Sequence, residues 1–201
     1  MGLTLSFETS CGACSVALSD DKEVLVYMIE EAKHRQSELL VQMIEDALAG
    51  AGAHYNDVDL IMLTNGPGSF TGIRIGLATA YGMHIALGLK IGAISTLTAM
   101  AQGFVEEKPA VVALDAGRHQ YYVQEFAANG EALSELQLWE EAQLHGYKGC
   151  IAGNFLLPGR EVVQLFPDAR QVAMYTLRHD VDSGGLPQPL YVREHDAVRR
   201  S

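Results

Sequence analysis

Asn65-Gly66-Pro67-Gly68-Ser69-Phe70-Thr71-Gly72 is the stretch of sequence that decides the fold. It follows Leu60-Ile61-Met62-Leu63, an apolar run that is typical of a buried parallel strand. After it, small and apolar residues with a helical period continue to Leu89, with no Asp, Glu, Lys or Arg between Arg74 and Lys90. A strand, a glycine-rich loop and a helix in this order place loop amides and a helix N-terminus at the carboxyl edge of a sheet, where functional sites are common.

The helix expected over Thr71–Leu89 carries small residues on two of its sides. Because it has no polar stripe, we expect it to be buried nearly all round. Small side chains let neighbours approach closely, so we expect its own sheet on one side and another helix, in this chain or in a partner, on the other. The small residues form two series four positions apart, which are Gly72, Gly76 and Ala80, and Ala78, Gly82 and Ala86.

The glycine-rich loop itself has two interpretations. It is not a Walker A loop, because no Lys-Ser/Thr pair follows the glycines. It is either a plain strand-to-helix turn with Ser69 or Thr71 as the N-cap, or a loop that contacts phosphate. The residues alone leave both interpretations open.

Composition limits the class of protein. The chain has 201 residues, of which 48% are hydrophobic and 19% charged, so we expect a globular protein with one large or two small domains. A net charge of −11 argues against broad direct contact with nucleic acid. Three cysteines and no visible signal peptide lead us to expect a reducing, cytoplasmic location. The uncharged stretch after Arg74 is shorter than the roughly 20 residues that span a bilayer, so we expect no membrane insertion.

The sequence pattern repeats once. Each half begins with a strand that ends in an acid, followed by a turn and two further strands, and the matching acids Glu8 and Asp115 are 107 positions apart. This spacing predicts a duplicated domain, with domains at 1–104 and 105–201, a linker at 105–109, and a shorter second copy. The strands expected are Leu3–Phe7, Cys14–Ser19 and Glu23–Ile29 in the first copy, and Ala110–Leu114, Gln120–Phe126 and Glu131–Leu138 in the second.

The remaining elements follow from apolar periodicity and from capping residues. An Asn129-Gly130 pair predicts a hairpin in the second copy. The other expected helices are His34–Leu48, Leu97–Phe104 capped by Ser95 or Thr96, and Asp168–Leu177, and the other expected strands are Lys90–Ile94, Lys148–Ala152 and Val162–Phe166.

Two sheets that each open with a hairpin and an acid resemble the actin, Hsp70 and sugar-kinase superfamily. The resemblance implies an α/β fold of two tandem RNase H-like (actin-like ATPase) domains with mixed sheets and a reduced second domain. It also implies that Glu8, Thr9, Ser10 and Asp115 would face a nucleotide cleft, if one is present. The first acid is usually Asp in that superfamily, and Glu8 in its place speaks against ordinary magnesium-nucleotide chemistry.

Within this superfamily, the glycine-loop stretch is similar to the signature of the bacterial tRNA threonylcarbamoyladenosine biosynthesis protein TsaB family, also called YeaZ. Ala13–Leu18, Leu114–Ala116 and Pro189–Arg193 also resemble that family, in the same order. The signature residues are Gly66, Pro67, Gly68, Ser69, Phe70, Thr71, Gly72 and Arg74.

The resemblance implies a scaffold that has no chemistry of its own. In the family, such a chain pairs with a TsaD-like catalytic subunit, and a TsaE-like ATPase joins them. The complex transfers a threonylcarbamoyl group to N6 of adenosine 37 in tRNAs that read ANN codons. The resemblance implies no catalytic residue and no required cofactor in this chain, any ATP or ADP at the partner interface, and only indirect contact with tRNA.

The resemblance also places the partner-binding surface on the helices of the first domain. We expect free chains to pair as homodimers through the same helices when the partner is absent. The catalytic subunit of the family holds a metal with His-x-x-x-His, but here Glu38 replaces the second histidine, so we expect no metal. The candidate interface residues are His34, Glu38, Gln42, Glu45, Gly76, Ala80, Met83 and His84.

Two other functions stay open. An actin-like small-molecule kinase or nucleotide hydrolase would need Glu8 and Asp115, and a metallopeptidase, the class with which the family has been grouped, would need a bound metal. Cys11 and Cys14 form a Cys-x-x-Cys pair, but it precedes a strand rather than opening a helix, so we do not expect a redox pair. The sequence offers no nucleophile and base at an interpretable spacing.

Overall fold

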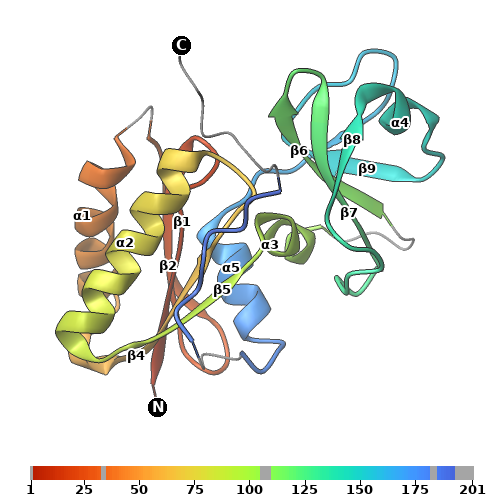
Figure 1. Ribbon diagram of the computed structural model, residues 1–201. Helices are drawn as coiled ribbons and strands as arrows, with labels where there is room; N and C mark the ends of the chain where they lie inside the picture. The colour runs from red at the N-terminus through yellow and green to blue at the C-terminus, as the bar shows by residue number, and fades with distance from the viewer. Residues whose placement is uncertain (1, 33–34, 105–109, 182–184, 193–201) are drawn as a thin grey trace, which may run out of the picture.

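The computed structural model describes residues 2–32, 35–104, 110–181 and 185–192, which form two five-stranded sheets with helices packed against them (Figure 1). The first sheet has the order β3-β2-β1-β4-β5, and the second has the order β10-β9-β6-β7-β8. The strands are β1 (Leu3–Glu8), β2 (Ala13–Ser19), β3 (Val24–Glu31), β4 (Val58–Thr64), β5 (Lys90–Ile94), β6 (Ala110–Gly117), β7 (Gln120–Phe126), β8 (Gln137–Glu140), β9 (Cys150–Gly153) and β10 (Val163–Gln164).

The two sheets share one topology. In each, the first strand of the copy is central, its hairpin partner is antiparallel to it, and the fourth strand is parallel to it on the other side. The α/β fold with two tandem mixed sheets is therefore confirmed. The second copy is reduced, because β9 and β10 contain only four and two residues.

The helices cover both faces of the first sheet. Figure 1 shows α1 and α2 on one face, and α3 and α5 on the face that is turned toward the second sheet. The core under α1 and α2 is built from large apolar side chains, such as Leu5, Phe7, Leu40, Ile44 and Ile73. The helices are α1 (Gln36–Gly50), the 3-10 helix η1 (Tyr55–Asp57), α2 (Phe70–Leu87), α3 (Thr96–Gln102), α4 (Glu141–Gly146) and α5 (Ala169–Thr176).

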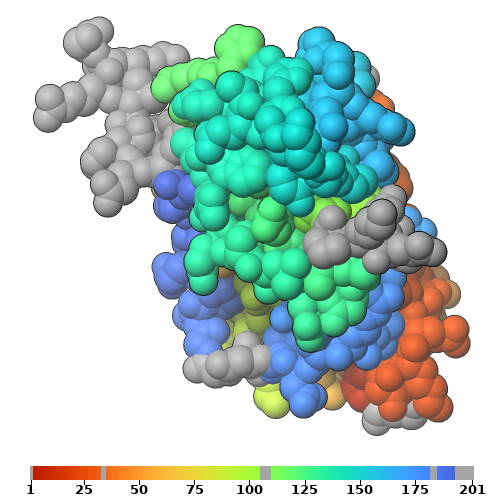
Figure 2. Space-filling model, turned by 90° about the vertical axis from the view of Figure 1, so that its right-hand side faces the viewer, coloured from red at the N-terminus to blue at the C-terminus, as the bar shows by residue number. Residues whose placement is uncertain are grey.

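Helix α3 joins the two sheets. Its Leu97 and Met100 pack in one cluster with Val112, Leu114 and Phe126 of the second sheet. In Figure 2, the green and teal atoms of the second sheet lie directly on the blue atoms that follow residue 165. Although α5 belongs to the second half of the chain, it packs on the first sheet, so the predicted domains 1–104 and 105–201 separate the two sheets but stay a prediction. The predicted linker, 105–109, lies outside the described residues.

The glycine-loop signature folds as a strand, a turn and a helix, as predicted. The Ser69 hydroxyl caps α2 by accepting a hydrogen bond from the Gly72 N–H at 3.3 Å. The helix ends at Gly88, whose positive φ of 73° gives the left-handed conformation that glycine favours at this position. None of the helices in the described part of the chain is long and apolar enough to cross a membrane.

The prediction that α2 is buried nearly all round is wrong. Its inner face is buried on the first sheet, but Ala78, Gly82 and Ala86 are exposed, and Ile85 is 83% exposed. Helix α1 lies beside α2 and leaves this outer face open, so the second of the two small-residue series faces solvent in the isolated chain.

The second sheet departs from the prediction at its third strand. Asn129-Gly130 does form a turn, but β8 begins at Gln137 rather than at Glu131. The segment before β8 forms only an isolated antiparallel bridge between Ala132 and Phe126, because the Ser134 hydroxyl then takes the Glu125 N–H at 3.0 Å in place of a backbone carbonyl. Helix α4 is absent from the prediction because it has six residues and buries only Leu144, which leaves no apolar period to detect.

Candidate functional site

The first candidate site is the turn that follows β1. Glu8 is 1% exposed, and its Oε1 accepts hydrogen bonds from the Ser10 N–H at 2.6 Å, from the Ser10 hydroxyl, and from the Thr64 hydroxyl at 3.2 Å. Burial raises the pKa of Glu8 to about 7, although these hydrogen bonds oppose the shift. Its Oε2 has no hydrogen-bond partner among the described residues. The turn therefore holds a buried carboxyl group that is poised to bind a proton near neutral pH.

The glycine loop closes over this turn. The Ser69 N–H donates to the Ser10 carbonyl at 2.7 Å, and the Thr9 hydroxyl donates to the Gly72 carbonyl at 2.8 Å. A Cβ on Gly68 would lie 2.8 Å from the Ser10 carbonyl oxygen, so only glycine fits there. Close packing on the turn therefore accounts for Gly68, and the capping hydrogen bond of Ser69 supports the interpretation of the loop as a capped strand-to-helix turn.

The matching acid of the second sheet has a different environment. Asp115 is exposed, and its Oδ1 accepts a hydrogen bond from the Gly117 N–H at 2.7 Å within its own turn. Glu8, Thr9 and Ser10 are all buried, so they do not line an open cleft opposite Asp115 in this structure. The nucleotide-binding role of these four residues stays a prediction.

Residues 185–192 lie along the loop and α2, and we refer to them as the C-terminal strap. The Asn65 side chain donates to the Gln188 carbonyl at 2.8 Å, and the Leu190 N–H donates to the Asn65 carbonyl at 2.8 Å. Arg74 stacks over the Phe70 ring at 3.6 Å and donates to the Tyr191 hydroxyl at 3.4 Å. The contacts of Arg74 are thus to neighbouring aromatic rings, and the strap holds the start of α2 in place.

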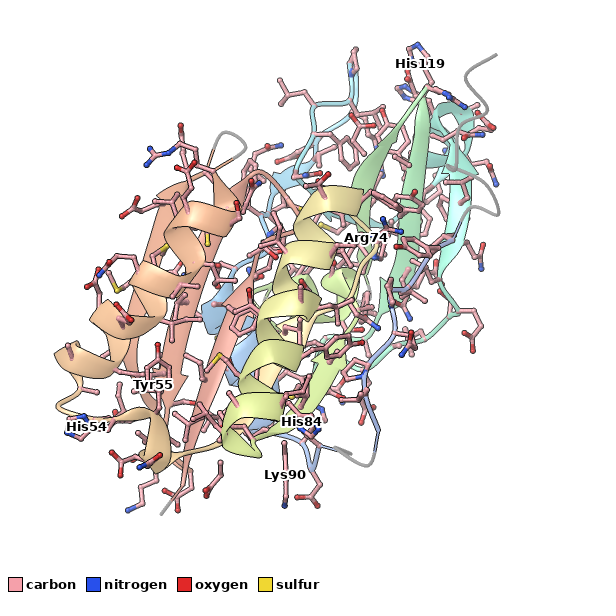
Figure 3. The ribbon with its side chains drawn as sticks, turned by 60° about the vertical axis from the view of Figure 1, so that its left-hand side comes forward. His54, Tyr55, Arg74, His84, Lys90 and His119 are labelled. Atoms are coloured by element: carbon pink, nitrogen blue, oxygen red, sulfur yellow. The ribbon has the colours of Figure 1, made fainter. Side chains whose placement is uncertain are left out.

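The second candidate site is the open surface of α1 and α2. Figure 3 shows the two helices side by side, with Tyr55 near the last turn of α1 and Arg74 near the start of α2. Between the helices lies a hollow of about 420 Å³, bounded mainly by apolar and small side chains. Val41 is 50% exposed and Leu87 is 41% exposed beside it. An apolar hollow between two helices, rimmed by exposed apolar side chains, is a surface suited to binding another protein.

The structure corrects two of the predicted interface residues. Gly76 and Ala80 are buried against the first sheet, and a Cβ on Gly76 would meet the Thr9 hydroxyl at 2.9 Å. They therefore cannot contact a partner directly. Ile73 and Leu77 lie on the same side of the helix and fix that side as the inner one, and this phase was available in the sequence.

The other predicted interface residues have varied positions. Glu38, Gln42 and Glu45 are exposed on α1, and Met83 lines the hollow. His84 is partly buried, with its Nδ1 2.7 Å from the Leu89 carbonyl oxygen. His34 lies outside the described residues. The role of these residues in an interface stays a prediction.

Four residues of the open surface were not among the candidates. Val41, Tyr55 and Leu87 line the hollow, and Ile85 is an exposed residue of α2. Val41 breaks the polar side of the first helix, and Ile85 follows the series Ala78, Gly82 at helical spacing, so both could have been found by periodicity. Tyr55 lies in the turn after α1, where the sequence shows no period.

The described part of the chain was also a place to look for a reactive cysteine pair and for a metal site. Cys11 and Cys14 are free thiols, and burial raises the pKa of Cys14 to about 12, which keeps it protonated and unreactive. Across residues 2–32, 35–104, 110–181 and 185–192, no three His, Cys, Asp or Glu side chains come together in a group that could hold a metal ion.

Comparison with known proteins places this geometry in a family. The family described as TsaD, tRNA N6-adenosine threonylcarbamoyltransferase, matches residues 29–143, which is more than half of the chain. The tRNA threonylcarbamoyladenosine biosynthesis protein TsaB of Haemophilus influenzae is 39% identical over 121 residues, covering 59% of this chain and 51% of that protein. The protein of the same name in Escherichia coli is 34% identical over 125 residues, covering 61% and 54%. The chain thus spans about half the length of the curated relatives it matches.

The fold has a solved counterpart. YeaZ from Pseudomonas aeruginosa superposes with a TM-score of 0.77, covering 96% of this chain and 100% of that chain at 23% sequence identity. At this identity, the similarity shows a shared fold. From the matching family model, the chain belongs to the TsaD family of tRNA N6-adenosine threonylcarbamoyltransferases, and it resembles the relatives named tRNA threonylcarbamoyladenosine biosynthesis protein TsaB.

Proposed function

We propose that this chain is a non-catalytic scaffold of the complex that adds a threonylcarbamoyl group to N6 of adenosine 37 in tRNAs that read ANN codons. In this proposal it pairs through α1 and α2 with a TsaD-like catalytic subunit, which it activates, and a TsaE-like ATPase joins the pair. The chain acts in the cytoplasm and pairs with itself when the partner is absent. The names of its relatives support a role in this modification.

Gly82 is the observation that carries the proposal. A glycine inside a helix destabilises it by about 1 kcal/mol relative to alanine. A Cβ on Gly82 would meet nothing within 4 Å, so packing within the chain does not explain this glycine. Ala78 and Ala86 are also exposed and lie about one helical turn before and after Gly82, so the three residues form a smooth track on α2. A helix of a partner protein that lies close against this track would account for all three small residues.

The acid turn supports the non-catalytic part of the proposal. A kinase of the actin-like class presents its acids to nucleotide and metal, whereas Glu8 has its Oε1 bonded to Ser10 and Thr64 beneath the glycine loop. Charge supports the indirect role toward tRNA, because a net charge of −11 repels the phosphate backbone. In this proposal the chain itself needs no cofactor, and any ATP or ADP binds at the interface with the partner.

The proposal is tested by size-exclusion chromatography with light scattering, on this chain alone and mixed with the TsaD-like subunit of the same organism. We expect a homodimer that exchanges into a one-to-one heterodimer. In the variant Gly82→Leu, the added side chain covers the track, so both dimers are lost while the chain stays folded. Gly146→Leu is the control, because a Cβ on Gly146, the last residue of α4, would also meet nothing within 4 Å, but α4 belongs to the second half of the chain.

Two outcomes would count against the scaffold. One is the absence of any complex, with or without ATP or ADP. The other is magnesium-dependent nucleotide binding by the isolated chain that is lost in Asp115→Asn, which would support the kinase-like alternative instead.

A further inference from the structure

The C-terminal strap is a surface segment next to a well-packed part of the chain. Val181, shortly before it, packs in one cluster with Met62 and Val172 and so belongs to the core. From residue 185 to residue 192 the chain forms neither helix nor strand, and none of these residues is buried. Figure 1 shows the strap in dark blue beside α2. The strap is therefore docked on the folded chain rather than built into its core.

The docked strap is held mainly by its main-chain atoms. The Pro187 carbonyl accepts a hydrogen bond from the Tyr81 hydroxyl, and the Gln188 carbonyl accepts one from the Asn65 side chain at 2.8 Å. The Leu190 N–H donates to the Asn65 carbonyl at 2.8 Å. A surface that binds the main chain of an extended segment is the kind of surface that recognises peptides, as in the addition of a strand to a sheet.

One side chain of the strap adds to these contacts. The Tyr191 ring stacks on Phe70 with the ring centroids 5.8 Å apart, and its hydroxyl accepts a hydrogen bond from Arg74 at 3.4 Å. Phe70, Arg74 and Tyr81 share one side of α2, which lies between its inner face and the Gly82 track. We call this side of the helix, together with Asn65, the strap flank.

The balance of these contacts favours local detachment of the strap. Holding an extended segment in one conformation costs conformational entropy at each of its residues. The hydrogen bonds that oppose this cost are each worth little in net terms, because water replaces them when the strap leaves. The stacked rings also stay half-exposed, with Phe70 at 47% and Tyr191 at 49%. Segments with few buried apolar contacts open at a lower free energy than the core does.

Docking of the strap bears directly on the glycine loop. A Cβ on Gly66 would lie 2.8 Å from the Leu190 carbonyl oxygen, so the strap packs against the backbone at the start of this loop. The same loop closes over the acid turn, where the Ser69 N–H donates to the Ser10 carbonyl at 2.7 Å. The Leu190 N–H therefore reports on docking of the strap, and the Ser69 N–H reports on closure of the loop.

We propose that the strap is a detachable latch, which leaves the strap flank while the rest of the chain stays folded, and which holds the glycine loop closed over the acid turn when it is docked. The strap flank is then a binding site for one extended, proline-containing peptide segment, and the strap occupies this site within its own chain. The inference does not depend on the proposed function, because it concerns contacts inside one chain.

Detachment is tested by amide hydrogen exchange of the full chain, measured for single residues by NMR at low urea concentrations. We expect the Leu190 N–H to exchange at least about 100-fold faster than the amides of the core strand β4. Its rate should not change with urea, because release of a short segment exposes little surface, whereas unfolding of the whole chain exposes much. If Leu190 and β4 exchange together and respond equally to urea, the strap opens only by global unfolding, and the latch is wrong.

Tyr191→Ala tests whether the strap holds the loop. The variant loses the stacked ring and the hydroxyl group, so we expect exchange to become about tenfold faster at the Leu190 N–H and about threefold faster at the Ser69 N–H, with β4 unchanged. Phe166→Ala is the control, because it removes another half-exposed ring outside the strap and α2, and it should change neither amide. If Leu190 responds and Ser69 does not, the strap detaches without releasing the loop, and the latch is wrong.

A peptide with the sequence of residues 185–192, Gly-Leu-Pro-Gln-Pro-Leu-Tyr-Val, separates a binding site from a purely structural contact. It is added to the Tyr191→Ala variant at about millimolar concentration or above, since a tethered segment has an effective concentration of that order. We expect the peptide to restore most of the lost protection of the Ser69 N–H, and a scrambled peptide of the same composition to restore none. If neither peptide acts, or both act equally, the strap flank is not a site for an extended segment, and the proposal is overturned.

Discussion

Gly72 and Gly82 lie in one helix, ten positions apart, and have opposite surroundings. A Cβ on Gly72 would collide with the Thr9 carbonyl group and come within 3.1 Å of the Ser10 Cα, whereas a Cβ on Gly82 would meet nothing within 4 Å. The fold of the chain itself requires the inner glycine. It gives no reason for the outer one, so the reason for Gly82 must be sought outside the chain.

The same substitution at the two positions should therefore have opposite effects. Gly72→Ala adds one carbon that meets backbone atoms, and a change of rotamer cannot relieve such a contact. We expect a loss of about 4 kcal/mol in the free energy of unfolding, despite the better helix propensity of alanine. Urea unfolding followed by circular dichroism measures this loss. A variant within about 1 kcal/mol of the original chain would show that the loop does not press on the turn.

The inner face of α2 also rests on a buried acid, which makes it sensitive to pH. The pKa of Glu8 is raised from 4.5 to about 7, so the folded chain binds this proton more tightly than the unfolded chain does. The stabilisation is complete below pH 4.5 and is lost as the pH rises through about 7. A shift of this size corresponds to about 3 kcal/mol.

Glu8→Gln isolates this effect, because the amide has the shape of the protonated acid and does not titrate. We expect the stability of the variant relative to the original chain to rise by about 3 kcal/mol between pH 4.5 and pH 8. Asp115→Asn is the matched control in the second copy, where the acid is exposed. Unfolding curves that stay parallel across this pH range would contradict a buried, titrating Glu8.

The inner and outer faces of α2 show how much of the structure could be predicted from the sequence alone. The order of strand, glycine loop and helix, the hairpins and the repeat of Glu8 in Asp115 were enough to predict a duplicated domain, because period and turn chemistry are local signals. That both copies contain a mixed sheet was implied by the resemblance to the actin-like superfamily. The phase of α2 could also have been predicted, since Ile73 and Leu77 mark its inner side. Without that phase, Gly76 and Ala80 were assigned to the wrong surface.

Other features could not be predicted because they depend on contacts between distant segments. The burial of Glu8 requires the loop at Ser69 to close over a turn that lies some sixty residues earlier in the chain. Tyr55 gains its position only when the ends of α1 and α2 come together. Gln188 and Leu190 of the strap are hydrogen-bonded to Asn65, and no local sequence pattern predicts these contacts.

Gly82→Ala has the smallest expected effect and is the sharpest test of the comparison. In the isolated chain, kept monomeric at low concentration, the methyl group enters open space and removes the flexibility of glycine in the unfolded chain. We expect the free energy of unfolding to rise by about 0.5–1 kcal/mol. On the partner side, the same methyl group separates two closely packed helices, so the affinity for the TsaD-like subunit should fall even as the monomer gains stability.

A gain in stability together with a loss in pairing is difficult to obtain in any other way. Substituting a residue with a purely structural role would lower both the stability of the monomer and its pairing with the partner. Substituting a neutral surface residue would change neither. Thermal unfolding of the monomer and calorimetric titration with the partner provide the two measurements on one protein preparation. If alanine lowers the stability of the monomer, then Gly82 has a role within the chain, and the contrast with Gly72 no longer points to a partner.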